Sequence, residues 1–407
     1  MKLRSVGQEG VFDRQQALEA VLAHAAHHSP YYREQDWAAE VRRGKRLALE
    51  ALPLTPKHLV RAEPERFFSA FVPPDHGAVR DKRTSGSTGE PLRIRKTQRH
   101  FKINQEENRR LLRDLEIEAH RSAVLIELPV DEHPAGEIEA LAMGPERKWV
   151  KFYSVDSLAI FNTLRRAEAT MMHGLPSLCQ SALEHSAESG TKLPIKLVWA
   201  VGEVVQDQLR ELVGAHPGCR LVDSYGCVEA GLVAAQCPHC GTYHVADRHV
   251  ILEVVSEDGR PAAPGQMGRV VLTPLFNWAT PLLRYEMEDY AVIAETGDCP
   301  RASLGLARVV GRERNLFKLP DGRKIMPRLP IHVAERLALR KLKLIQTTIT
   351  DIQMLYVPRD DGMELSRDMA QDIIDRFMSP GFTVYPQRVP DIPRSPSGKY
   401  LMHECLV

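Results

Sequence analysis

Long apolar runs, a charge imbalance and a dense cysteine framework are all missing from this 407-residue sequence. No stretch approaches the roughly 18 consecutive apolar residues of a membrane helix, and the opening MKLRSVGQEGVFDR lacks the apolar core of a secretory signal. The net charge of +1 gives no broad electrostatic reason to expect nucleic acid or an anionic membrane as a partner. We therefore expect a cytoplasmic protein with neither kind of partner.

Cysteine is scarce as well. Seven cysteines in a chain of this length are too few for a disulfide scaffold, and an odd number leaves at least one free thiol. This usage suits a reducing compartment. Some of the thiols are therefore candidates for binding a metal.

The chain length favours two domains, or one large domain with a smaller one attached. Apolar positions at helical spacing predict a first helix within residues 12–28. From residue 122 to residue 227, short apolar strands alternate with helical stretches, which predicts a mainly parallel sheet covered on both faces. From about His244 onward the pattern changes to strands and turns, which is typical of a β-rich part.

A third pattern begins after Arg312, with helices predicted near 331–342 and 366–377 on either side of the strand-like TTITDIQMLYV. We therefore predict an α/β fold with two domains. The large N-terminal domain covers residues 1–311 and includes a β-rich part at about 232–310, and a small α+β C-terminal domain covers residues 312–407. The sequence contains no internal repeat or heptad pattern, which disfavours solenoids and coiled coils.

The run TSGSTGEPL, residues 84–92, combines four hydroxyls with two glycines. Glycine allows a backbone to turn tightly against a ligand, and hydroxyls and amide N–H groups can surround phosphate oxygens. The run matches neither the G-x-x-x-x-G-K-[ST] phosphate loop nor the G-x-G-x-x-G dinucleotide fingerprint. It therefore indicates another kind of phosphate cradle, with a flexible Ser/Gly linker as the alternative.

Further motifs follow this run in a recognisable order: AVGE at 200–203, SYGCVEAG at 224–231, PLLRYEMEDY at 281–290, GRERN at 311–315 and PRSPSGKY at 393–400. Weaker matches, such as SPYYRE, LPLTPKHLV and HGLPSL, extend the pattern almost from end to end. Together these segments resemble the adenylate-forming enzyme superfamily and, within it, the phenylacetate-CoA ligase family.

The resemblance implies ATP-dependent activation of a carboxylic acid as an acyl-adenylate, followed by transfer to the thiol of coenzyme A with release of AMP. The expected acid is aryl or arylacetic. In the first step a carboxylate approaches the phosphates of ATP, and both are anions. The site must therefore supply hydrogen-bond donors and positive charge, including Mg²⁺. The resemblance also implies that the C-terminal domain is mobile, rotates about a hinge near Arg312 and withdraws a lysine from the site between the two steps.

The resemblance assigns individual roles to residues of these motifs. Lys399 would contact the carboxylate and the α-phosphate, and Glu229 would help to hold Mg²⁺. Asp289 would accept hydrogen bonds from the ribose, Arg312 would lie beside the nucleotide, and Tyr225 would pack on the adenine. The other expected nucleotide-binding residues lie in the same motifs and are Thr84, Ser85, Gly86, Ser87, Thr88, Gly89, Gly202, Glu203, Ser224 and Gly226.

Three positions depart from the superfamily pattern. Val228 stands where Thr is usual, Arg314 stands at the usual hinge Asp, and Glu288 stands where Gly often precedes the ribose-binding acid. These changes bear on the rate, on nucleotide fit and on the use of free coenzyme A. The alternative to an enzyme is therefore a non-catalytic relative that keeps the fold and only binds a nucleotide.

The acceptor in the second step has several candidates. Coenzyme A phosphates would meet Arg323, Lys324, Arg328 or the run RKLK at 340–343, unless these residues form the solvated face of a surface helix. A carrier-protein phosphopantetheine or an amine are the alternative acceptors. Related proteins are often dimers, so a homodimer is an alternative to a monomer.

The acyl pocket is expected near 128–137, HGLPS and SYG. Asp131, Glu132 and His133 make the first of these segments polar, which allows an amino- or hydroxy-substituted ring. A solvated loop is the simpler interpretation of these three residues.

The segment CPHCGTYH contains Cys237, Cys240 and His244, the soft ligands that zinc prefers. Cys299 would be the fourth ligand, as related phenylacetate-CoA ligase-like sequences carry Cys and His at similar places. A closed four-ligand site would be structural. His239 and Asp247 are possible substitutes for a ligand, and a pair of unligated thiols is the alternative to a metal site.

Overall fold

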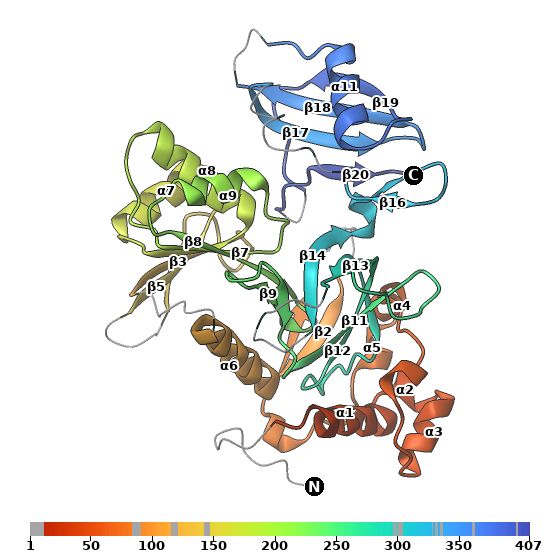
Figure 1. Cartoon of the computed structure of the whole chain (residues 1–407). Helices are drawn as coiled ribbons and strands as arrows, with labels where there is room; N and C mark the ends of the chain where they lie inside the picture. Colours follow the sequence, from red (N-terminus) through yellow and green to blue (C-terminus); the bar gives the residue numbers. More distant parts are fainter. Residues whose placement is uncertain are drawn as a thin grey trace.

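The computed structural model describes residues 12–83, 91–114, 121–141, 147–295, 299, 304–327, 329, 333, 337–359, 363–395 and 398–407. Figure 1 shows helices around the N-terminus at one end of the molecule and a small sheet near the C-terminus at the other. None of the helices in these ranges is long and apolar enough to span a bilayer.

A mixed sheet of twelve strands dominates the described part of the chain. Its strands are β3 (Ser122–Glu127), β4 (Ile138–Leu141), β5 (Lys148–Tyr153), β6 (Met171–Gly174), β7 (Leu197–Val201), β8 (Arg220–Cys227), β9 (Gly231–Gln236), β10 (Tyr243–Val245), β11 (Val250–Val255), β12 (Met267–Pro274), β13 (Tyr285–Ile293) and β14 (Gly305–Arg312). They are ordered β11-β12-β13-β14-β10-β9-β8-β7-β6-β3-β5-β4.

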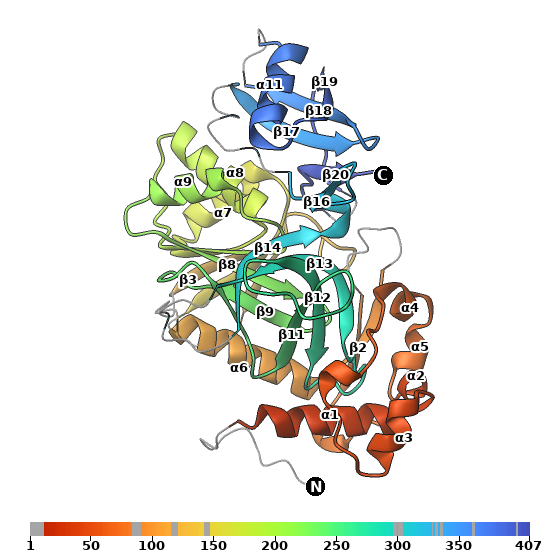
Figure 2. The ribbon, with the colours of Figure 1, turned by 45° about the vertical axis from the view of Figure 1, so that its right-hand side comes forward.

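The predicted parallel region is confirmed for β5, β3, β6, β7 and β8. The crossovers between these strands contain α7 (Ser157–Arg166), α8 (Pro176–Glu188) and α9 (Asp207–Gly214). The three helices share one core with the strands, built on residues such as Leu164, Leu178 and Val198. Helix α6 (Gln98–Asp114) lies on the other side of the sheet (Figures 1 and 2), where Asn104 accepts a hydrogen bond from the backbone of Leu232 in β9.

The predicted β-rich part is antiparallel and continues the same sheet through β9 to β14. The N-terminal helices pack on this part through a second core that includes Val21, Leu22, Val270 and Tyr285. These helices are α1 (Arg14–His28), α2 (Pro30–Arg33), α3 (Asp36–Arg42), α4 (Lys57–Ala62) and α5 (Pro64–Phe67), and the antiparallel pair β1 (Val79–Arg83) and β2 (Arg93–Thr97) follows them. The predicted first helix is confirmed, and it ends at the cap Ser29, before Pro30.

The C-terminal part has its own α+β core, to which Phe317, Leu344 and Ile374 belong. Its elements are the short pair β15 (Phe317–Lys318) and β16 (Lys324–Ile325), followed by β17 (Leu339–Gln346), β18 (Asp351–Pro358), α11 (Arg367–Phe377), β19 (Thr383–Arg388) and β20 (His403–Cys405). Strands β17 to β20 form a four-stranded sheet with the order β19-β18-β17-β20. The division into two domains at Arg312 stays a prediction.

One predicted helix extends too far along the chain. Within the helix expected near 331–342, Val333 is helical, but the chain is a strand from Leu339 onward. A register shift between Leu339 and Lys341 leaves the buried Leu339 and Leu342 three residues apart, which imitates helical spacing, although the side chains alternate regularly from Lys341 onward. The helix expected near 366–377 is confirmed by α11, which Ser366 caps at its N-terminus.

Candidate functional site

A cleft of about 2780 Å³ runs along the large sheet and reaches the C-terminal part. It includes the carboxyl ends of β7 and β8, the edge at which parallel sheets commonly bind ligands. The structure brings every described residue of the predicted nucleotide-binding and catalytic set to this cleft. The lining residues from that prediction are Gly202, Glu203, Ser224, Tyr225, Gly226, Glu229, Asp289, Arg312 and Lys399.

Lys399 is carried into the cleft by a tight turn. The backbone N–H of Ser395 donates to the carbonyl of Lys399 at 2.8 Å, and that of Gly398 donates to the carbonyl of Ser395 at 2.8 Å. Gly398 has φ of +75°, and a Cβ there would lie 2.8 Å from Leu128, so only glycine suits this position. Burial lowers the pKa of Lys399, and the charges of Arg312 and Arg314 lower it further, against Glu203 and Asp289.

Glu203 fixes the segment that carries Lys399. One of its carboxylate oxygens accepts from the backbone N–H of Tyr400 at 2.7 Å, and the other accepts from the N–H of Ser177 at 3.0 Å. Arg394 donates to the Ser177 hydroxyl at 2.7 Å and lies 3.8 Å from the Glu203 carboxylate. Sequence reasoning assigned no role to Arg394 or Tyr400, and it placed Ser177 only within the HGLPS segment of the expected acyl pocket.

Gly202, directly before Glu203, has φ of +89°, and a Cβ there would lie 3.0 Å from Leu175. Its Cβ position is also 3.9 Å from the Lys399 ammonium nitrogen. A larger residue would strain the turn and crowd the lysine. Gly202 therefore serves the site by adopting the left-handed backbone conformation and by leaving room for the Lys399 side chain.

Asp289 and Arg312 face each other across β13 and β14, where they are register partners. The Tyr225 hydroxyl donates to Asp289 at 2.6 Å, and the Arg312 guanidinium lies 3.9 Å from the other carboxylate oxygen. Burial and the Asp289 charge raise the pKa of Tyr225, so its hydroxyl stays protonated and can donate. Glu288 adopts φ of +60°, a left-handed conformation, which explains why glycine suits the position before this acid.

Glu229 is buried, and the structure surrounds it with two residues that sequence reasoning missed. Its Oε1 accepts from the Tyr285 hydroxyl at 3.0 Å and lies 3.5 Å from the ammonium of the buried Lys57. Both contacts fall on the same oxygen, which leaves Oε2 as the candidate ligand atom for a hard cation. The signal for Lys57 was present in LPLTPKHLV, where a lysine begins a short helix after an apolar turn.

Ser224 and Gly226 have structural contacts in the described chain. The Ser224 hydroxyl accepts from the Trp199 indole at 2.9 Å and donates to the Ala200 carbonyl at 3.1 Å. A Cβ on Gly226 would lie 2.8 Å from the Gly231 carbonyl, so this glycine allows β8 and β9 to approach. Val228 lines the cleft beside Glu229 and offers no hydroxyl.

The predicted phosphate-binding residues Thr84 to Gly89 lie outside the described residues. The paired strands β1 and β2 flank this segment, with Arg83 opposite Arg93 at its base.

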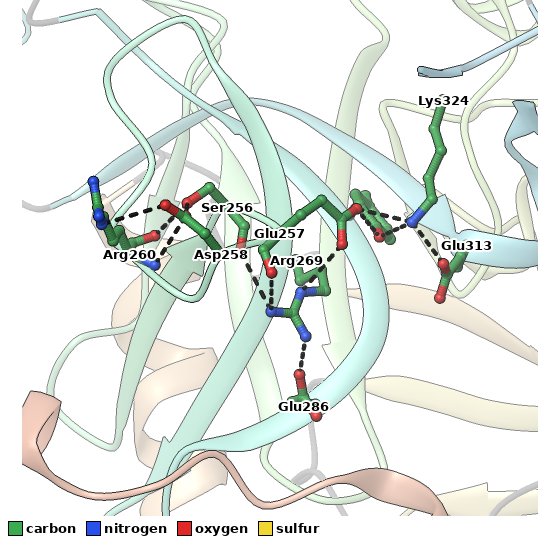
Figure 3. A network of polar contacts seen from close by, with 9 residues as sticks. Ser256, Glu257, Asp258, Arg260, Arg269, Glu286, Glu313 and Lys324 are labelled. Carbon is green, nitrogen blue, oxygen red and sulfur yellow. Dashed lines mark hydrogen bonds and ion pairs between the residues drawn. The ribbon is translucent and has the colours of Figure 1, made fainter. Parts of the chain in front are cut away.

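The candidate coenzyme A contacts are mostly engaged in ion pairs. Lys324 donates to Glu257 at 2.8 Å, to Glu313 at 2.7 Å and to the Tyr290 hydroxyl at 2.7 Å. Figure 3 shows Lys324 between Glu257 and Glu313 at the end of a network that continues through Arg269 to Glu286. Burial disfavours the Lys324 ammonium, but its hydrogen bonds outweigh burial and raise its pKa.

The remaining candidates for coenzyme A differ in their surroundings. Arg323 pairs with Asp321 at 2.6 Å, Lys341 with Asp391 at 2.7 Å, and Lys343 with Glu404 at 2.6 Å. Arg340 is exposed and lines the cleft. Arg328 lies outside the described residues.

The loop 128–137 is a solvated turn. None of its residues lines the cleft, and Asp131 and Glu132 are exposed. His133 stacks on Tyr153 with ring centroids 4.5 Å apart and contacts Glu137 at 3.1 Å. The polar residues of this loop therefore do not form an acyl pocket in this arrangement, whereas His173 and Tyr225 from the other two predicted segments do line the cleft.

The predicted cysteine cluster forms a compact group. The ligand atoms of Cys237, Cys240, His244 and Cys299 all lie within 4.8 Å of one another. His244 Nε2 is 3.4 Å from the Cys240 sulfur and 3.3 Å from the Cys299 sulfur, close to the edge of about 3.5 Å expected between S and N ligands of tetrahedral zinc. His239 and Asp247, the proposed substitutes, are not in this group.

Comparison with known proteins gives a fold assignment. No family model matches the chain, and no curated protein matches it. A solved structure of 2-hydroxyisobutyryl-CoA ligase in the postadenylation state, in complex with 2-HIB-AMP, aligns with a TM-score of 0.75 at 16% identity and covers 97% of this chain and 88% of that chain. The same ligase in the thioesterification state, with 2-HIB-AMP and CoA, aligns with a TM-score of 0.60 at 16% identity over 100% of this chain and 94% of that one.

Two more distant solved structures broaden this group. The anthranilate CoA ligase AuaEII in complex with anthranoyl-AMP has a TM-score of 0.55 at 15% identity and covers 78% of this chain and 65% of that chain. The amide bond synthetase McbA from Marinactinospora thermotolerans has a TM-score of 0.52 at 16% identity and covers 78% and 66%. The chain therefore has the fold of adenylate-forming enzymes, with a large mixed sheet and a small C-terminal part.

Proposed function

We propose that this chain is an AMP-forming acid–thiol ligase of the phenylacetate-CoA ligase-like type, acting on an aryl or arylacetic acid. The observation that carries the proposal is the convergence of Lys399, Glu203, Asp289 and Arg312 on one cleft, although they come from separate segments of the chain. A protein that only bound a nucleotide would have no need to hold a buried lysine there. The higher similarity to the postadenylation state supports an arrangement in which Lys399 serves the first step.

In that first step, a carboxylate oxygen of the substrate attacks the α-phosphorus of ATP. The bond to the bridging oxygen breaks, and pyrophosphate leaves with the electron pair. Lys399 donates to the oxygens on which negative charge gathers, and Arg312 adds positive charge beside Asp289. Tyr225 holds the Asp289 carboxylate in place for the ribose hydroxyls.

A magnesium ion fits the site through Glu229, whose Oε2 has no hydrogen bond to any residue in the described part of the chain. When bound, the ion would neutralise phosphate charge during adenylation. Lys57 and Tyr285 would orient the Glu229 carboxylate, since both contact its other oxygen. The Cys237, Cys240, His244 and Cys299 group fits a structural zinc, because all four positions of a tetrahedron are then filled by the protein.

In the second step, a thiol attacks the acyl carbon, loses its proton and displaces AMP. We propose coenzyme A as the thiol and a rotation of residues 312–407 as the change that admits it. The exposed Arg340 is the candidate to meet its phosphates, since Lys341 and Lys343 are already paired. Carrier-protein phosphopantetheine and an amine remain the alternative acceptors, and a homodimer the alternative to a monomer.

The test is acid-dependent exchange of labelled pyrophosphate into ATP, measured over a panel of aryl, arylacetic and aliphatic acids. Exchange that aryl acids support and Lys399→Ala abolishes, while ATP still binds, is the expected result. Incubation of the active acid with coenzyme A, with a phosphopantetheinylated carrier protein or with amines then identifies the acceptor. ATP binding without exchange for any acid would favour a non-catalytic nucleotide-binding relative.

A further inference from the structure

One face of the parallel strands carries a groove that the crossover helices do not cover. Chain connections between parallel strands are nearly always right-handed, and β6, β7 and β8 follow one another in one direction across the sheet. This places α7, α8 and α9 together on one face, as Figures 1 and 2 show. The connection from β3 to β5 contributes the edge strand β4 within its described residues.

The floor of the groove is apolar. Alternate residues of each strand point to opposite faces, and Leu125, Met171, Leu197 and Trp199 form a small cluster that is separate from the core under the helices. Met171 and Leu197 are buried within this cluster, and Leu125 and Trp199 are its more exposed members. These four side chains line the same cleft as Lys399. The floor therefore leads directly away from the adenylation site along β6 and β7.

Helix α6 forms the opposite wall and is polar. Asn104, Gln105, Asn108 and Arg109 of this helix line the cleft. A ligand in the groove would thus lie between an apolar sheet face and a row of hydrogen-bonding side chains.

The far end of the groove is basic. Backbone hydrogen bonds align Arg121 with Lys148, Ser122 with Thr170, and Lys196 with Arg220, so the amino ends of β5, β3, β6, β7 and β8 form one edge. Arg121, Lys196 and Arg220 on this edge line the cleft, as does Arg113 near the end of α6. Asp223, three residues after Arg220, accepts a hydrogen bond from Tyr243 and pairs with Arg210.

Both ends of the groove therefore carry positive charge, so one ligand with an anionic group at each end would fit them. Lys399 lies beyond the carboxyl end of β7, and Lys196 directly precedes the amino end of that strand. At about 3.3 Å per residue, the five-residue strand separates these ends by on the order of 15 Å.

We propose that the acid activated by this site is an extended one: its reacting carboxylate lies at Lys399, its aromatic body lies over Leu125 and Trp199, and a second anionic group lies at the edge formed by Arg121 and Lys196. This inference rests on the proposed adenylation. A simple phenylacetic acid would reach only the first part of the groove. Aromatic contact supplies the affinity of the body, and the basic edge selects for the second anion.

The experiment compares two series of phenylalkanoic acids of increasing chain length. The acids of one series carry a second carboxylate on the ring, and those of the other carry a methyl group at the same position. A third arm replaces the ring carboxylate with a phosphate, which distinguishes the kinds of anion. Pyrophosphate exchange gives kcat and KM, and calorimetric titration of the protein without ATP gives binding independently of catalysis. The variants are Arg121→Glu/Lys196→Glu and, as a control with the same charge change away from the cleft, Arg33→Glu/Arg43→Glu, at two exposed residues near the ends of α2 and α3.

We expect the long ring-carboxylate or ring-phosphate acids to have the lowest KM. The double variant should raise that KM about tenfold, because two partly exposed ion pairs are lost, and should leave the ring-methyl acids unchanged. The control variant should change neither. A KM for the ring-methyl acids as low as for the charged ones, or equal effects of the double variant on both series, would overturn the inference while the adenylation itself stands.

The binding arm separates the two hypotheses. If no acid supports exchange, the adenylation is refuted, and charge-dependent calorimetric binding that the double variant removes would still support an anion site at the basic edge. If calorimetry detects no preference for the charged acids, the extended-acid inference is refuted whatever the exchange assay gives.

Discussion

The carboxylate of Glu203 and the backbone N–H of Tyr400 lie 2.7 Å apart although the two residues are 197 positions apart in the chain. The contact holds the residue next to Lys399 against the carboxyl end of β7. Because Glu203 also accepts from Ser177, one side chain connects the large sheet, helix α8 and the C-terminal segment. The position of Lys399 therefore depends on a residue that never needs to touch the acid.

We predict that Glu203→Gln slows adenylation more than it weakens ATP binding. The loss of negative charge weakens two hydrogen bonds, and those to a charged acceptor are worth about 1.5–3 kcal/mol each. A ten- to hundredfold fall in the rate of pyrophosphate exchange is expected by order of magnitude. The matched control is Glu211→Gln in α9, and an equal fall in that variant would remove the positional explanation.

The pH dependence of adenylation should report the environment of Lys399. Its lowered pKa means that the ammonium loses its proton at a lower pH than an ordinary lysine, so exchange activity should fall on the alkaline side. Arg314→Asp replaces a charge that lowers this pKa with one that raises it. The alkaline limb of the exchange profile should therefore move to higher pH in this variant.

This second prediction has a simple contrary result. An alkaline limb that stays in place in Arg314→Asp, with Lys399 still essential, would mean that another group controls the profile. Arg43→Asp changes the charge by the same amount at an exposed residue away from the cleft and should leave the limb where it is.

Lys324 should stabilise the arrangement in which Lys399 occupies the cleft. It connects Glu257 and Tyr290 of the large sheet to Glu313, beside the proposed hinge. We expect Lys324→Met to lower the rate of adenylation by several-fold and to spare thioester formation from a preformed acyl-adenylate. Lys45→Met, which removes an exposed pair with Glu40, is the control, and an equal loss in both half-reactions would contradict the assignment.

The cysteine cluster should bind one zinc ion per chain. Cys299→Ser should reduce the zinc content measured by elemental analysis and lower Tm, because the metal joins the turn after β9 to the segment before β14. Cys219→Ser, at a thiol outside the cluster, should change neither quantity. Full-length protein that is purified without zinc and does not gain stability when zinc is added would rule out the structural role.

The elements that sequence reasoning predicted well carry a strong local signal. Helices α1 and α11 have helical spacing of their apolar residues and a capping Asp or Ser, and β7 is a short apolar run. The start of strand β17 was missed because a register shift places Leu339 and Leu342 at helical spacing. For 128–137, the simpler interpretation as a solvated loop was the right one, although a polar loop next to a predicted strand does not reveal which way it turns.

The order of motifs along the chain determined the adenylate-forming resemblance and the residues expected at the nucleotide, because each motif is a contiguous pattern of residue types. One contiguous segment also predicted Cys237, Cys240 and His244 as metal ligands, and the resemblance added Cys299. Only the tertiary structure decided that Lys57 and Tyr285 share Glu229, that Glu203 positions Lys399, and that an apolar groove connects this site to a basic edge. Those relationships join residues that are far apart in sequence, and they depend on which strands become neighbours and on which face the crossover helices pack. No local pattern of amino acids contains that information.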